Sequence, residues 1–200
     1  YNMFKPGDTR REGTVIVYAD EIAKVQEMLD NGELPEGTNP FVMSQEQEKF
    51  EGLGHYKYHQ RKETASSVDP INNYFFSYRF YRYADVLLLA VELEARITGS
   101  VSSEAQGWYN EIRDRAFQNE NNRITLAGKS KQEILDIIFE ERRFEFTDEM
   151  QRWFDILRFD KGTEILASKG WTEKYRYFPL DQSEMDKTKG NITLNPGWLQ

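Results

Sequence analysis

The sequence contains no cysteine and two histidines in 200 residues. Without cysteine, this stretch of chain holds no disulfide, no thiolate metal site, no cysteine nucleophile and no lipid-accepting cysteine. Long apolar runs are missing as well, since the longest, Val86 to Val91, has six residues and a membrane-spanning helix needs about 20. We therefore expect no membrane-spanning helix, and cysteine usage gives no information about the compartment.

Basic residues are outnumbered, with 26 Lys and Arg against 34 Asp and Glu, which gives a net charge of −8. Nucleic-acid binding depends on clustered Lys and Arg that face phosphates, and the sequence shows no such cluster, so DNA and RNA are excluded as main partners. Aromatic residues are plentiful, at 14%. Large apolar side chains at this density offset the entropy cost of ordering the chain, so we expect a single folded unit with a real core.

The pattern of the sequence changes near residue 79. Residues 1–78 are rich in turn signals that separate short β-branched or aromatic runs such as Thr14 to Tyr18, which predicts one or two short strands. An amphipathic stretch from Asp20 to Leu29 predicts a short helix. Residues 79–160 have a helical period, and residues 161–200 return to loop.

Two successive apolar stripes repeat the offsets 0, 3, 4, 7 and 11, which is the spacing of one helix face. Between them, Thr98-Gly99-Ser100 is a helix stop and Ser102 or Ser103 a helix start, and so short a connection predicts an antiparallel hairpin. The stripes are Ala84, Leu87, Leu88, Val91 and Ala95, then Ala105, Trp108, Tyr109, Ile112 and Ala116.

A third helix is predicted from a capping box at Ser130 to Glu133, with Arg142 at offset 7 of its apolar stripe. A fourth stripe follows Thr147-Asp148, so a second hairpin or a kinked long helix is expected. It consists of Met150, Trp153, Phe154 and Leu157. The predicted fold class is mostly α, a tetratricopeptide-like α-hairpin array with irregular, loop-rich flanks and one or two short strands.

Five strings, in order from about residue 8 to residue 198, resemble signature segments of the SusD/RagB family of surface glycan-binding lipoproteins. They are Asp8-Thr9-Arg10-Arg11; Arg82-Tyr83-Ala84-Asp85-Val86-Leu87-Leu88; Asn110-Glu111-Ile112-Arg113-Asp114-Arg115-Ala116; Glu141-Arg142-Arg143-Phe144-Glu145 continuing to Arg152-Trp153-Phe154-Asp155-Ile156; and Phe178-Pro179-Leu180 with Asn195-Pro196-Gly197-Trp198. The sequence departs from the family pattern at four positions. The sequence has Met150 where the family commonly has Gly, Asp181 where it has Pro, Leu194 where it has Gln, and Trp198 where it has Tyr.

The resemblance implies a C-terminal portion of a longer protein, in keeping with an N-terminus that begins at Tyr1 and looks like an interior cut. It implies non-catalytic binding of a polysaccharide or oligosaccharide at the cell surface and delivery to a SusC-like TonB-dependent outer-membrane transporter. It also implies an outer-membrane lipid anchor outside these residues. The hairpin stripes alone suggest an alternative, a helical-repeat adaptor that binds other proteins.

The acidic and basic residues of the third helix admit two interpretations. Glu140, Glu141 or Glu145 could be the acid and base of a glycoside hydrolase, where two carboxyl groups face each other across a sugar ring. Carboxylates beside arginines on one helix face are instead typical of paired, ionised groups, so we favour a structural ion-pair network and expect no catalytic residue. The network is predicted to include Glu141, Arg142, Glu145, Arg152 and Asp155.

The two histidines, His55 and His59, lie in an alternating Tyr/Lys segment that favours a strand, in which they would be about 13 Å apart. We expect no metal site there. No nucleophile motif, P-loop or Rossmann glycine pattern is present, so no enzyme activity and no cofactor are expected. Glycan sites are aromatic platforms with amide or charged neighbours, and the loop residues that fit are Tyr56, Tyr58, Asn72, Asn73, Tyr74 and Trp171.

Overall fold

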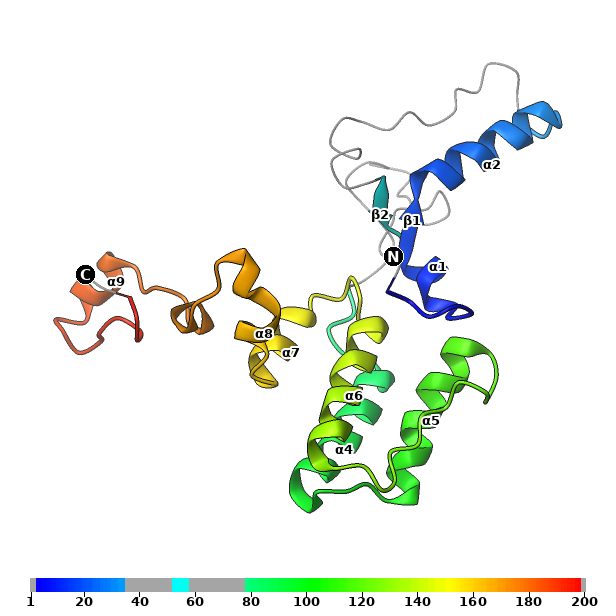
Figure 1. The fold of residues 1–200 in the computed structure, drawn as a ribbon. Coiled ribbons are helices and arrows are strands. Elements are labelled where there is room, and N and C mark those ends of the chain that lie inside the picture. The colour runs from blue at the N-terminus through cyan, green and yellow to red at the C-terminus, as the bar shows by residue number, and fades with distance from the viewer. Residues whose placement is uncertain (1–2, 35–51, 58–77, 199–200) are drawn as a thin grey trace. The chain divides into compact units, whose positions relative to one another are not determined.

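The computed structural model describes residues 3–34, 52–57 and 78–198 (Figure 1). Two compact units are present, residues 1–149 and residues 150–200. In the described part of the chain, no helix has both the length and the apolar character needed to cross a bilayer.

The first unit is built on three helices, α4 (Tyr83–Thr98), α5 (Ser103–Phe117) and α6 (Lys131–Glu145). Helix α4 is the central one, because it packs against both α5 and α6. It ends at Gly99, whose φ of 78° is a left-handed conformation that glycine adopts without strain. Ser102 then caps α5 by accepting a hydrogen bond from the backbone of Ala105 at 3.1 Å.

The apolar stripes predicted for the first two helices form the core of this unit, with every member buried except the half-buried Trp108. The capping box predicted at the start of α6 is present, since Ser130 and Glu133 each accept a hydrogen bond from the other's backbone. Arg142, at offset 7 of the α6 stripe, is buried along with the apolar residues.

The N-terminal part of the same unit contains α1 (Arg10–Thr14), β1 (Val15–Val17), α2 (Tyr18–Asp30) and β2 (Leu53–His55). The two strands pair antiparallel, with Val15 opposite His55. Thr9 attaches this part to α5, because its backbone and its hydroxyl both donate to the carbonyl oxygen of Ala116, at 2.9 and 3.0 Å. The expected fold class, mostly helical with an α-hairpin array and short strands, is thus confirmed.

The second unit consists of α7 (Arg152–Arg158), α8 (Gly162–Leu166), α9 (Gln182–Lys187) and two 3-10 turns, η2 (Ala167–Lys169) and η3 (Glu173–Arg176). The apolar stripe predicted here is wrong in part, because Met150 and Phe154 are exposed, by 77% and 66%. Met150 has a left-handed φ of 57° and precedes the helix, so the helical period starts later than the sequence pattern suggests. The residues that α7 buries are Asp155 and Ile156.

Candidate functional site

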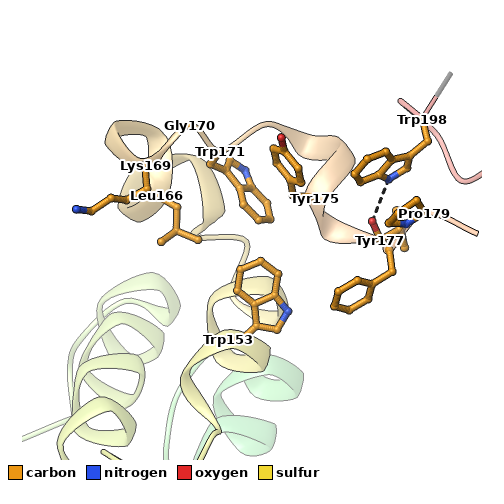
Figure 2. Close-up of a pocket in the computed structure, with 10 residues that line it drawn as sticks. Trp153, Leu166, Lys169, Gly170, Trp171, Tyr175, Tyr177, Pro179 and Trp198 are labelled. Atoms are coloured by element: carbon orange, nitrogen blue, oxygen red, sulfur yellow. Dashed lines mark hydrogen bonds between the residues drawn. The ribbon is translucent and has the colours of Figure 1, made fainter. Parts of the chain in front are cut away.

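The second unit contains a cavity of about 510 Å³ with an aromatic wall. Figure 2 shows the rings of α7, η3 and the C-terminal segment turned toward one space. Among the described residues that line it, Lys169 is the one with a charge, and none is a carboxylate. The aromatic members are Trp153, Trp171, Tyr175, Tyr177, Phe178 and Trp198.

The rings contact each other in a continuous row. Trp153 and Trp171 have centroids 5.7 Å apart and planes inclined by 69°, and Tyr175 and Trp198 meet at 5.7 Å and 80°. Trp171 and Tyr175 connect the two pairs at 6.3 Å. Edge-to-face contacts at these distances stabilise aromatic pairs by about 0.5–1.5 kcal/mol beyond burial. The wall is therefore held in place by its own ring contacts.

A glycine lets the row form. A Cβ at Gly162, the first residue of α8, would lie 2.5 Å from the indole of Trp171, closer than real Cβ atoms approach. Any side chain at this position would push Trp171 away from α8. The local sequence thus fixes where the central ring of the wall can lie.

The C-terminal turn Asn195-Pro196-Gly197-Trp198 closes one side of the cavity. The Trp198 indole N–H donates to the carbonyl oxygens of Lys174 and Tyr177, both at 3.0 Å (Figure 2 draws the second bond). Asn195 Nδ2 donates to the carbonyl oxygen of Phe178 at 2.7 Å. Gly197 has a φ of 84°, and a Cβ there would lie 2.6 Å from the Cβ of Lys174. The turn therefore docks on the segment that carries the exposed rings.

Among the rings that line the cavity, Tyr175, Tyr177 and Phe178 are exposed, and Phe178 is 81% exposed. Exposed rings beside a preformed apolar wall can stack on the C–H face of a flat ligand ring. The phenol groups of Tyr175 and Tyr177 add polar edges. A site of this composition can bind a ligand by stacking, and the carboxylate pair that most glycoside hydrolases use is not among its described lining residues.

The first unit contains a separate, buried ion-pair network around α6. Glu141 accepts hydrogen bonds from Arg10 Nη1 at 2.7 Å, Arg113 Nη1 at 2.9 Å and the Tyr109 hydroxyl at 3.1 Å. The burial of Tyr109, together with the Glu141 charge, raises the pKa of its phenol. Glu141 therefore ties α5 and the start of α1 to α6.

Glu145, one turn after Glu141, is surrounded by three guanidinium groups. Arg82 and Arg115 each form an ion pair with its carboxylate, and Arg10 Nη1 lies 3.1 Å away. Burial would raise the pKa of Glu145, but the positive charges of Arg82, Arg115 and Arg10 outweigh it and hold the pKa below its ordinary value. A general acid needs a raised pKa, so this environment is the opposite of the one required.

Arg142 of α6 forms an ion pair with a residue of α4. Its Nη1 donates to Asp85 Oδ1 on α4 at 2.6 Å, and both residues are buried. The guanidinium also lies 4.7 Å from the centroid of the Phe146 ring. In the second unit, Asp155 pairs with Arg158 at 2.8 Å within α7, and Arg152 is the first residue of that helix.

A model of the SusD family matches residues 1–198 of the chain. The chain belongs to the SusD family. It is 32% identical over 127 residues to SusD-like protein P2 of Formosa agariphila, a match that covers 58% of this chain and 25% of the relative.

Among solved structures, Surface glycan-binding protein A from Bacteroides thetaiotaomicron matches with a TM-score of 0.70 and 27% identity, over 98% of this chain and 40% of that one. A laminarin binding SusD-like protein matches in fold with a TM-score of 0.63 and 22% identity, over 96% of this chain and 36% of that one. The chain therefore spans a quarter of the curated relative and two fifths of the solved protein that is matched first.

The residues predicted to bind glycan belong to different segments of the chain. Trp171 is in the aromatic wall, whereas Tyr56 follows β2 in the first unit and lines a smaller hollow there with Ile16 and Lys24. Each of these two predicted residues lines a hollow of its own unit. The other four predicted residues, Tyr58, Asn72, Asn73 and Tyr74, lie outside the described residues.

The sequence pattern groups Tyr175 and Tyr177 with Trp171 as loop aromatics, but Trp153, Phe178 and Trp198 were not predicted as members of the site. Trp153 had been assigned to an apolar stripe, and Trp198 to a turn motif. The available signal was the density of aromatics between residues 171 and 198. Of the two histidines, His55 pairs with Asp148, and His59 lies outside the described residues. No group of potential metal ligands occurs in the part of the chain that the structure describes.

Proposed function

We propose that this member of the SusD family is part of a non-catalytic protein that binds a polysaccharide or oligosaccharide. We further propose that the aromatic cavity of residues 153–198 is a stacking site for a sugar ring. The observation that carries the proposal is the row of contacting rings in a cavity whose lining includes the exposed Tyr175, Tyr177 and Phe178. Membership in the SusD family and the likeness to a surface glycan-binding protein support it.

Sugar rings combine an apolar C–H face with a rim of hydroxyls. The indoles of Trp153 and Trp171 offer the apolar face a partner, and the exposed phenols of Tyr175 and Tyr177 offer hydrogen bonds to the rim. We propose that the ligand is held without being cleaved, in keeping with the lack of a carboxylate pair among the described lining residues. Of the three glutamates considered for a hydrolase, Glu141 and Glu145 are buried against arginines in the first unit, and the exposed Glu140 pairs with Arg143.

For the whole protein, we propose attachment to the outer membrane by a lipid outside these residues, and transfer of the bound glycan to a SusC-like TonB-dependent transporter. We also propose that the chain is the C-terminal portion of a longer polypeptide, and its coverage of 25% of the curated relative and 40% of the solved glycan-binding protein supports its being a portion. Family membership is the basis for the transporter as partner.

The site is tested with the full-length protein and single-residue variants. Phe178→Ala removes a ring that is 81% exposed, so the fold does not depend on it. Calorimetry against a panel of oligosaccharides should show the dissociation constant rising about tenfold, which corresponds to the loss of about 1.4 kcal/mol of stacking. Trp171→Ala should weaken binding at least as much.

The matched control is Phe154→Ala, which removes an exposed ring of α7 that does not line the cavity. It should leave the affinity unchanged. If the Phe178, Trp171 and Phe154 variants bound glycan with equal affinity, the cavity would not be the binding site. Release of reducing ends would favour a hydrolase, and a lack of binding to every glycan would favour a helical-repeat adaptor.

A further inference from the structure

A second hollow lies in the first unit, between the start of α5 and the segment that connects α5 to α6. We call it the α5 hollow. Its volume is about 310 Å³, within the range of small-molecule sites. No aromatic ring is among its described lining residues, and most of its side chains are polar. The polar members are Ser102, Ser103, Gln106, Asn110, Arg123 and Thr125.

Gln106, on α5, is held in place by three hydrogen bonds. Its Oε1 accepts from the backbone N–H of Leu126 at 2.7 Å, and its Nε2 donates to the carbonyl oxygen of Ile124 at 3.1 Å. Its Nε2 also donates to Asn110 Oδ1 at 2.9 Å. Because a backbone N–H can only donate, the bond from Leu126 fixes which end of the Gln106 amide is oxygen. Both amide hydrogens of Gln106 are used, so this side chain fastens the connecting segment to α5.

Asn110, one turn after Gln106, is oriented by the same bonds. Its Oδ1 accepts from Gln106, so its Nδ2 is the end of the amide that remains. Nδ2 carries two donors, and neither has a partner in the part of the chain that the structure describes. The side chain is half-buried and lines the hollow. A fixed amide with two unused donors beside a hollow is a group that a ligand oxygen can satisfy.

The charges around the α5 hollow favour a neutral ligand over an anion. Arg123 is already paired, with Asp114 at 2.5 Å and with Glu120 at 2.9 Å. Glu94 accepts from the backbone N–H and the hydroxyl of Ser102, at 2.6 and 3.1 Å, and so places a negative charge at the N-terminus of α5. An anion would be repelled by that charge. An uncharged ligand with several oxygens meets no such penalty.

We propose that the α5 hollow is a second saccharide site, which binds a neutral sugar ring by its hydroxyls. The free amide hydrogens of Asn110 donate to ring hydroxyl oxygens, and the exposed hydroxyls of Ser103 and Thr125 donate to or accept from others. The side chains of Val101 and Ile124 supply apolar contact for the C–H face of the ring. The α5 hollow and the aromatic cavity belong to different units, so each can be altered separately by mutation.

The experiment measures binding of methyl glycosides of glucose, galactose, mannose and xylose to the full-length protein by saturation-transfer NMR. Asn110→Ala removes the two free donors, and alanine suits a helix better than asparagine, so the fold is kept. For at least one glycoside, the dissociation constant should rise at least fivefold. Asn110→Asp keeps the shape of the side chain but replaces the donors by an oxygen, and it should weaken binding as much. The matched control is Gln132→Ala, which removes an amide of α6 that is bonded to Asp136 at the same spacing and should change nothing.

The same glycosides are tested against Trp171→Ala, which removes the central ring of the aromatic cavity. The effect of Asn110→Ala should be the same with and without this change. Binding that is weakened by Trp171→Ala but not by either Asn110 variant would support the proposed function and overturn this inference. Binding that is weakened by the Asn110 variants alone would support this inference and count against the cavity. Preference for methyl glucuronide over the neutral glycosides would mean an anion site, and no binding of any glycoside would mean no site, so either result overturns the inference.

Discussion

Arg142 is a charged residue at a position where the sequence pattern requires an apolar one, and its environment explains how it is tolerated. The guanidinium is paired with Asp85 at 2.6 Å and stacked on Phe146, and both charges are buried. We expect Arg142→Ala to lower the free energy of unfolding by about 3–5 kcal/mol, because it leaves the Asp85 charge buried without this partner. Urea denaturation of the chain measures this loss.

A neighbouring arginine serves as the control for that prediction. Arg143 pairs with Glu140 at 3.3 Å on the surface of the same helix, and such pairs contribute about 1 kcal/mol or less. Arg143→Ala should therefore cost little. If the two variants lost equal stability, the pair between Arg142 and Asp85 would not be what holds α4 and α6 together.

Met150 is a residue in a conformation that suits glycine. Its φ is 57°, and the resemblance to the SusD family places glycine at this position. The side chain is 77% exposed, so it contributes little packing. Because the left-handed conformation costs a residue with a Cβ about 1–2 kcal/mol, Met150→Gly should raise the free energy of unfolding by up to about 1 kcal/mol. Met150→Ala is the control, and a gain of the same size with alanine would contradict the explanation.

Individual residues also mark the limit of what the sequence could predict. The offset of Arg142 in its stripe predicted a buried, paired arginine, but the partner, Asp85, lies 57 residues away. Arg10, which pairs with Glu141, is 131 residues away from it. Such pairs depend on how helices pack against each other, and a local pattern contains no information about that.

At the scale of elements, helices with strong periods and caps were predictable, and the short helix α7 was not. The stripes of α4, α5 and α6 repeat over about three turns, and Gly99, Ser102 and Ser130 mark ends that the structure places at the same residues. Helix α7 has seven residues and no side-chain cap, so neighbouring apolar residues such as Met150 were included in its stripe by mistake.

The Glu145 cluster joins the N-terminal segment, the start of α4, and α5 to α6, so its ionisation affects four elements together. Burial opposes the charge, but Arg82, Arg115 and Arg10 lower the pKa of Glu145 below its ordinary value of 4.5. Because the pKa of Glu145 is lower in the folded state than in the unfolded state, its charge stabilises the fold fully above about pH 4.5. This stabilisation is lost as the pH falls through the pKa of Glu145 in the folded state.

Urea denaturation of the chain from pH 7 to pH 3 checks this pH dependence. Glu145→Gln should be less stable than the original chain at pH 7 and should lose less further stability toward pH 3. Glu140→Gln changes an exposed carboxylate on the same helix and should keep the original pH profile. A Glu145→Gln profile parallel to the original one would show that the cluster does not set the acid sensitivity.

The C-terminal turn is an element whose docking depends on glycine. Gly197 and Gly190 have nearly the same φ, 84° and 82°, but a Cβ at Gly197 would meet Lys174 at 2.6 Å and a Cβ at Gly190 would meet nothing within 4 Å. Both alanine variants are destabilised by the left-handed conformation, and Gly197→Ala also places its Cβ too close to Lys174. We expect Gly197→Ala to expose Trp198, which red-shifts tryptophan fluorescence, and Gly190→Ala to leave the emission maximum unchanged. A shift of equal size in both variants would exclude the clash as the cause.

At the scale of the whole molecule, the fold class followed from the sequence but the candidate site did not. Helical periods are local, so an α-hairpin array could be predicted from residues 79–160. The aromatic wall joins Trp153 to Trp198 through rings that are distant along the chain, and the loops between them have no period from which a shape could be derived. Trp171 was predicted because it is an aromatic residue in a loop. The rings around it could not be predicted, because they come together only in the folded chain.

The proposed placement of the whole protein at the cell surface is tested outside the 200 residues. They contain no cysteine, so a lipid anchor requires one upstream. We expect the full-length open reading frame to begin with a secretory signal followed by a lipid-accepting cysteine, and a TonB-dependent transporter gene to lie beside it. Fractionation should place the protein in the outer membrane, and a Cys→Ala change at the anchor should release it. Purification from gently solubilised membranes should recover the transporter with it. A reading frame without a signal, together with a cytosolic protein and no neighbouring transporter, would contradict this placement. The helical-repeat adaptor would then be the better explanation of the α-hairpin array.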